Sequence, residues 1–103
     1  MSKMLHLVNK SPTERNSLDS CLRLAETGSA VLLLEDGVYA AMANAAYAEA
    51  VTARMGELTF YVLGPDVSAR GLDDKPLIDG ITSVDYEGFV DLVVEHEATQ
   101  SWL

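Results

Sequence analysis

Cys21 is the single cysteine of this sequence and its strongest intrinsic nucleophile. A thiolate attacks sulfur readily, and a helix N-terminus or a neighbouring cation lowers the pKa of a thiol. Leu18 and Leu22 share the helical face of Cys21 and are typical of a hydrophobic core. Judged from these residues alone, Cys21 is interpreted as a buried structural thiol, with sulfur chemistry as the alternative.

The distance from Cys21 to the start of its helix bears on its reactivity. If Asn16 is the N-cap, Cys21 lies about 7 Å along the axis, beyond the strongest influence of the helix dipole. The segment Ser11–Glu14 has the form of a capping box, and a helix that begins there gives the thiol no help. Asp19 would raise the thiol pKa further. The sequence therefore predicts modest reactivity in the isolated chain.

The remaining polar candidates have weaker patterns. Glu35 and Asp36 could form an acid/base pair or a site for a hard metal ion, but adjacent carboxylates usually diverge. The favoured interpretation is that Asp36 caps the next helix while Gly37 makes the turn. His6 and His96 have no partner at ligand spacing and are predicted to be core or surface histidines. With no glycine-rich phosphate loop either, no metal and no cofactor are expected.

Apolar runs and helical periodicity indicate which elements position these residues. Strands are predicted at Met4–Val8, Ala30–Leu34, Leu58–Leu63 and Ile81–Val84. Helices are predicted at Ser11–Glu26, Val38–Arg54 (with Asn44 capping an internal break), Pro65–Arg70, and from an Asp85 N-cap to about Glu97. This alternation predicts one α/β domain over residues 1–103, a parallel sheet flanked by helices with flavodoxin-like layering. Functional groups are then expected after the strands, at Asn9–Asn16, Glu35–Gly37 and Gly64–Asp66.

The composition narrows the classes of partner. Sixteen acidic and seven basic side chains give a net charge of −9, and the cations are scattered without a basic run. Because nucleic-acid binding uses clustered Lys and Arg, no direct nucleic-acid contact is expected. A lone cysteine excludes an intramolecular disulfide, and the sequence has neither a signal-peptide pattern nor an apolar run of bilayer length. The expected location is the cytoplasm, without membrane attachment.

The order of several motifs resembles the DsrH/TusB family of sulfur-relay subunits. The N-terminal half matches at Met4-Leu5-His6, at Asn9-Lys10-Ser11-Pro12, at Leu18–Leu24 and at Leu33–Ala41. The C-terminal half matches at Phe60–Leu63, Ala69–Leu72, Asp85–Val90, His96 and Ser101-Trp102. The resemblance covers essentially the whole chain in order.

This resemblance implies a DsrE/DsrF-type fold and a heterohexamer with DsrE/TusD-like and DsrF/TusC-like subunits, two copies of each. In the TusB branch, persulfide sulfur passes toward 2-thiolation of the tRNA wobble uridine; in the DsrH branch it serves oxidation of stored sulfur. A downstream small acceptor protein is also implied. Cys21 matches the cysteine of DsrH sequences, which favours that branch, while the principal acceptor cysteine is expected on the DsrE/TusD-like subunit.

Three hypotheses follow for the role of the chain. It could be a sulfur-carrier subunit, a sulfurtransferase component that acts only within the complex, with Cys21 as a secondary persulfide carrier. It could be a non-catalytic scaffold of the same complex, with Cys21 structural. An independent flavodoxin-like ligand binder is the third, although it lacks a phosphate motif. The alanine-rich segment 38–54 and the terminal Trp102-Leu103 are the candidate contact surfaces.

Overall fold

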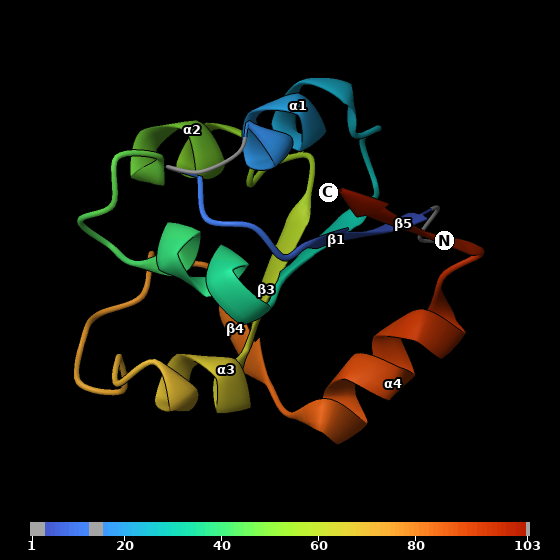
Figure 1. Cartoon of the computed structure of the whole chain (residues 1–103). Helices are drawn as coiled ribbons and strands as arrows, with labels where there is room; N and C mark the ends of the chain where they lie inside the picture. Colours follow the sequence, from blue (N-terminus) through green and yellow to red (C-terminus); the bar gives the residue numbers. More distant parts are fainter. Residues whose placement is uncertain (1–3, 13–15, 103) are drawn as a thin grey trace.

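A five-stranded, all-parallel sheet lies at the centre of the computed structural model, which describes residues 4–12 and 16–102 (Figure 1). The strands are β1 (Met4–Val8), β2 (Ala30–Leu33), β3 (Thr59–Leu63), β4 (Thr82–Val84) and β5 (Ala98–Trp102). The helices are α1 (Ser17–Leu24), the 3-10 helix η1 (Glu35–Ala41), α2 (Ala48–Ala53), α3 (Gly64–Ala69) and α4 (Tyr86–Glu95). The predicted α/β fold, a parallel sheet flanked by helices, is confirmed.

The strand order β4-β3-β2-β1-β5 places helices on both faces of the sheet. From β1 to β4 the chain adds strands in one direction, and α4 then crosses back to lay β5 against the other side of β1. Crossover connections between parallel strands are right-handed. A connection that runs back across the sheet in the reverse direction, as α4 does, therefore lies on the opposite face from the earlier helices. Figure 1 shows this arrangement, with α1 and α2 on one side of the sheet and α4 on the other.

Two hydrophobic clusters correspond to these two faces, because strand side chains alternate between them. On the α1 face, strand residues pack with Leu18, Cys21 and Leu22 of α1 and with buried residues of η1, α2 and α3. The strand residues of the α1 face are Val8, Val31, Leu33, Phe60 and Val62. The buried residues of the α4 face are Leu5, Ala30, Leu32, Leu63 and Leu92. Most of the buried core therefore lies on the α1 face.

Helix α1 is shorter than the sequence predicts, because it begins at Ser17 rather than at Ser11. Residues 13–15, which include Thr13 and Glu14 of the predicted capping box, lie outside the described residues. The buried side chains of α1 begin at Ser17 and Leu18 and continue with Cys21 and Leu22. Short helices depend on tertiary packing, so the helix follows the buried residues rather than the capping pattern.

The helix predicted at Val38–Arg54, with an internal break capped by Asn44, is also wrong. Residues 35–41 form η1, Met42 pairs with Leu77 in an isolated antiparallel bridge, and α2 begins only at Ala48. Backbone bonds from Ala43 N–H to the Pro76 carbonyl (2.9 Å) and from Ile78 N–H to the Ala41 carbonyl (2.8 Å) hold the bridge. Long-range pairing thus overrides the helix propensity of the alanines, and Tyr47 rather than Asn44 occupies the N-cap of α2.

The C-terminal region contains a confirmed helix start and a missed strand. Asp85 caps α4 as predicted, its Oδ1 accepting a 2.8 Å hydrogen bond from the Gly88 N–H. Strand β5 was not predicted, and it pairs with β1 from Met4↔Ala98 to Val8↔Trp102. Within the part of the chain that the structure describes, no helix has the length and apolarity to cross a bilayer.

Candidate functional site

Cys21 lies on the inner side of α1 with no exposed surface. The helix places it on the same face as Leu18 and Leu22, and all three are part of the cluster on the α1 face. Its position is the fifth residue of an eight-residue helix whose N-cap position is Asn16. The thiol is thus away from the helix N-terminus and among aliphatic side chains, where a thiolate is poorly solvated.

Burial raises the pKa of Cys21 to about 12, and the nearby Arg54 guanidinium only partly offsets that effect. The predicted contribution of Asp19 is wrong, since this carboxylate does not raise the thiol pKa. It lies 3.7 Å from the Arg23 guanidinium on the exposed side of α1. At neutral pH the thiol is therefore protonated, and a protonated thiol is a poor nucleophile.

Arg54 binds the C-terminal end of α1, a role that was not predicted from the sequence. Its guanidinium donates to the carbonyls of Leu22 and Ala25, the latter at 2.9 Å, and pairs with Glu57 at 2.6 Å. A cation beside unpaired carbonyls at a helix C-terminus is favourable on both hydrogen-bonding and dipole grounds. The one signal in the sequence is an isolated arginine at the end of an alanine-rich segment, and its partner is about 30 residues away along the chain.

The three segments expected after β1, β2 and β3 do meet at the carboxyl edge of the sheet. The Asn9 side-chain amide donates to Glu35 Oε1 at 3.1 Å, and the Glu35 backbone N–H donates to Asp66 Oδ2 at 2.6 Å. Glu35 has φ +51°, the left-handed region that side chains rarely adopt, and these bonds fix it there. Asn9 Oδ1 is buried without a hydrogen-bond partner among the described residues.

Asp36 and Gly37 have roles that differ from the predicted cap and turn. Asp36 pairs with Arg70, the C-cap residue of α3, with Nη2 at 2.9 Å and Nε at 3.0 Å, while Leu34 occupies the N-cap position of η1. Gly37 allows close packing: a Cβ built on it would lie 2.1 Å from the Val8 carbonyl oxygen. The carboxylate of Asp36 is therefore engaged in an ion pair that joins η1 to α3.

The two histidines are held by internal contacts. His6 is buried, and its Nδ1 accepts a 2.9 Å hydrogen bond from the indole N–H of Trp102. Because Nδ1 is the acceptor, the ring is neutral with its proton on Nε2, and burial lowers the pKa of His6. His96 Nδ1 lies 2.6 Å from the Leu92 carbonyl. Trp102 is thus partly buried against the cluster on the α1 face, while Leu103 lies outside the described residues.

These geometries do not assemble a reaction centre within residues 4–12 and 16–102. Cys21 is sealed on the α1 face, and the polar groups at the carboxyl edge are bonded mainly to one another. No group of His, Cys, Asp and Glu among the described residues has the arrangement of a metal site. What the arrangement provides is a set of side-chain contacts that joins the segments after β1 and β2 to α3 at the carboxyl edge of the sheet.

Comparisons with known proteins extend over nearly the full chain. Protein TusB from Pectobacterium parmentieri is 37% identical over 99 residues, which cover 96% of this chain and all of the relative. Protein TusB from Klebsiella pneumoniae subsp. pneumoniae is 38% identical with the same coverage. Among solved structures, the ychN protein from E. coli superposes with a TM-score of 0.86 at 18% identity, covering 98% of this chain and 99% of that one.

The structure of MTH1491 from Methanobacterium thermoautotrophicum gives a TM-score of 0.70 at 16% identity, covering 95% of this chain and 99% of that one. At such identities these two structures show the fold alone. The model of the family described as "DsrH like protein" matches residues 10–99. With relatives above 30% identity over their whole length, this match means that the chain belongs to the DsrH family, as the motif resemblance predicts.

Proposed function

We propose that this chain is a structural subunit of a sulfur-relay complex that serves 2-thiolation of the tRNA wobble uridine. The observation that carries the proposal is the full-length likeness to TusB proteins together with the DsrH family match. Its partners in the proposal are DsrE/TusD-like and DsrF/TusC-like subunits, and a separate small acceptor protein takes the sulfur onward in the cytoplasm. With a net charge of −9, the chain itself makes no direct contact with tRNA.

In this proposal Cys21 packs and does not carry sulfur. Persulfide transfer requires a thiolate that can reach the donor sulfur. A pKa of about 12 leaves roughly one thiol in 100,000 ionised at pH 7, and the Cys21 side chain has no exposed surface. The carrier role, in which Cys21 acts as a secondary persulfide acceptor, would require α1 to move away from the sheet within the complex.

Complementation tests the proposed function. A bacterial strain lacking TusB receives this chain together with its own DsrE/TusD-like and DsrF/TusC-like subunits, and wobble 2-thiouridine is measured by mass spectrometry of digested tRNA. We expect thiolation to return only when all three subunits are present. A complex that forms but leaves the wobble uridine unmodified would contradict the assignment to tRNA thiolation.

The same system separates the two roles of Cys21. Cys21→Ala removes the thiol without leaving a buried hydroxyl unpaired, and its packing cost is limited to the space of one sulfur atom. We expect full thiolation with Cys21→Ala, and sulfur loading on the DsrE/TusD-like subunit alone when the complex meets a persulfide donor. Added sulfur on this chain, lost in Cys21→Ala together with onward transfer, would establish the carrier role instead.

A further inference from the structure

Helix α4 presents apolar side chains to solvent as well as to the sheet. Leu92 is buried against the α4 face and Phe89 packs beside it. The exposed fractions of the other large apolar side chains are 59% for Tyr86, 58% for Val90, 41% for Val93 and 78% for Val94. A hollow of about 170 Å³ lies among Phe89, Val90, Val93 and Val94. A helix that is apolar beyond its buried side is typical of a contact surface.

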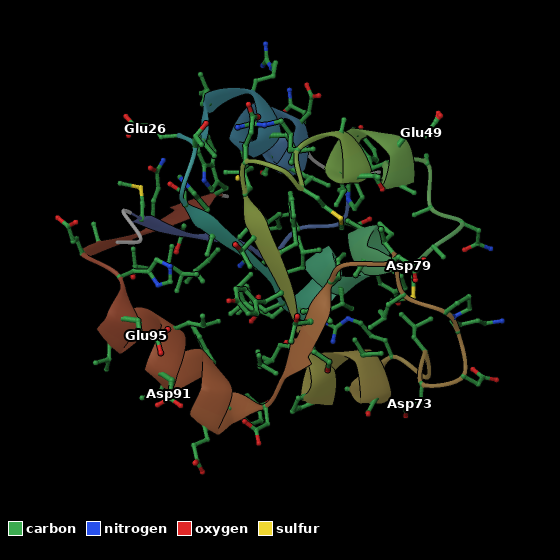
Figure 2. The ribbon with its side chains drawn as sticks, turned by 180° about the vertical axis from the view of Figure 1, so that it is seen from behind. Glu26, Glu49, Asp73, Asp79, Asp91 and Glu95 are labelled. Atoms are coloured by element: carbon green, nitrogen blue, oxygen red, sulfur yellow. The ribbon has the colours of Figure 1, made fainter. Side chains whose placement is uncertain are left out.

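Three of the four exposed apolar residues of α4 form one stripe, and acidic residues form a second stripe beside it. Tyr86, Val90 and Val94 recur at i, i+4 and i+8, so they lie along one line of the helix. Glu87, Asp91 and Glu95 recur with the same spacing, one position further round, and all three are exposed. Figure 2 shows Asp91 and Glu95 on α4, well away from Glu49 and Asp79.

No basic side chain balances the acidic stripe within this part of the chain. The sequence from Pro76 to Leu103 contains six carboxylates and no Lys or Arg. Among the described residues, none of the three carboxylates of the stripe has an ion-pair partner. A second copy docked through α4 would bring its own acidic stripe close by, and like charges facing each other oppose such a contact. The charge pattern therefore favours, as the partner of α4, a different protein whose contact surface has a basic margin, meaning Lys or Arg side chains along its edge.

We infer that α4 is the apolar centre of the contact between this chain and a related subunit of the relay complex. The partner surface is a hydrophobic patch that fills the hollow at Phe89–Val94, edged by Lys or Arg facing Glu87, Asp91 and Glu95. This inference rests on the proposed function for the existence of the complex. A ten-residue helix is about 15 Å long, so the contact extends beyond α4, with the valines as its centre.

The apolar part of the inference is tested with the full chain and its co-expressed DsrE/TusD-like and DsrF/TusC-like subunits. The double variant Val90→Asp/Val94→Asp alters only exposed positions, so the isolated chain should stay folded, with an unfolding midpoint only slightly lowered by repulsion from Glu87 and Asp91. We expect its affinity for the other subunits to fall by at least about 100-fold, because buried carboxylates would replace central apolar contacts. Leu24→Asp, a single substitution at a position 67% exposed on α1, is the control for an added carboxylate elsewhere and should change affinity by less than about threefold.

The charged part is tested by two variants that change net charge equally. Asp91→Lys/Glu95→Lys should weaken assembly about tenfold at low salt and much less at high salt. Glu49→Lys/Asp79→Lys, at two positions that Figure 2 shows well away from α4, should have little effect on assembly. Equal weakening by both pairs would mean that only the total charge matters, and would overturn the claim of a basic margin.

The outcomes separate this inference from the proposed function. If the wild-type chain does not assemble with the two subunits, the proposed complex fails and the inference fails with it. If the wild-type chain assembles and Val90→Asp/Val94→Asp assembles equally well, only the assignment to α4 is overturned. If the isolated chain is a dimer that Val90→Asp/Val94→Asp converts to a monomer, the occupant of α4 is a second copy, which also overturns the inference.

Discussion

On the α1 face of the sheet Cys21 has no exposed surface, whereas on the α4 face the side chain of Val94 is 78% exposed. Of the large apolar side chains that are exposed, four lie on α4, and Leu24 and Tyr39 are the others within the described residues. The α1 face is completed by three helices and η1, while α4 alone covers the opposite face. The contrast shows that the α1 face, which contains Cys21, is well covered by helices, whereas the helix on the α4 face leaves apolar side chains exposed to solvent.

The largest effect expected from this contrast is on the stability of the isolated chain. Phe60→Ala removes a side chain that is 1% exposed on the α1 face and should cost about 3–5 kcal/mol of unfolding free energy. Val94→Ala on the open face should change it by less than about 0.5 kcal/mol. Urea denaturation followed by circular dichroism measures both, and loss of cooperative unfolding in Phe60→Ala would agree with the expectation. Similar losses for both variants would contradict the contrast.

A second prediction concerns how α1 is held over Cys21. Arg54→Met removes the guanidinium that bonds the C-terminal carbonyls of α1, and should cost about 1.5–3 kcal/mol. Arg23→Met is the control, because the Arg23 side chain is 69% exposed and its pair with Asp19 contributes about 0–1 kcal/mol. Chemical denaturation compares the two. Equal costs would mean that Arg54 does not secure the helix.

The sequence predicts the parts of this architecture in which the buried residues are contiguous. Strand β1 is predicted with its observed bounds, and Asp85 is the N-cap of α4. By contrast, β5 has the polar sequence Ala-Thr-Gln-Ser-Trp, and only its pairing with β1 makes it a strand. Side-chain pattern cannot reveal a strand defined by backbone pairing alone.

The candidate site could be predicted only in part for a related reason. The packing of Cys21 follows from the local periodicity of Leu18 and Leu22, and burial is what the structure shows. Arg54 acts on α1 from a segment about 30 residues away, and the pairing of Asp36 with Arg70 spans 34 residues. Such contacts depend on the tertiary arrangement and leave no periodic signal in the sequence.

A third prediction uses pH to test whether the thiol is sealed. Because burial raises the pKa of Cys21 to about 12, the folded state binds the thiol proton more tightly than the unfolded state. The contribution of the thiol to stability is complete below about pH 8.5 and is lost as pH rises toward 12, with a slope of up to about 1.4 kcal/mol per pH unit. The difference in unfolding free energy between wild type and Cys21→Ala, measured from pH 8 to pH 11, should follow this slope. A difference independent of pH would mean that solvent reaches the thiol.

The smallest expected effect concerns the edge of the α1 face, where His6 meets Trp102. Trp102→Phe removes the indole N–H that His6 Nδ1 accepts and should cost about 0.5–1.5 kcal/mol. Gln100→Ala, at an exposed position of β5, should cost less than about 0.5 kcal/mol. Since burial lowers the pKa of His6, stability should also decrease as pH falls below about 6.5, where the unfolded chain takes up the proton first. Replacing His6 with Asn should remove that acid dependence, and its persistence would point to other groups.

The position of β5 beside β1 also has a consequence for how the chain folds. Strand β1, with the sequence Met-Leu-His-Leu-Val, is synthesised well before residues 98–102, which are the described residues that pair with its outer edge. Until then the nascent chain carries an apolar strand with a row of free backbone groups, the kind of edge that invites pairing with other chains. The polar strand that finally covers it acts as a cap against aggregation. The outer edge of β1 is therefore shielded only after β5, a strand of largely polar residues, has been synthesised.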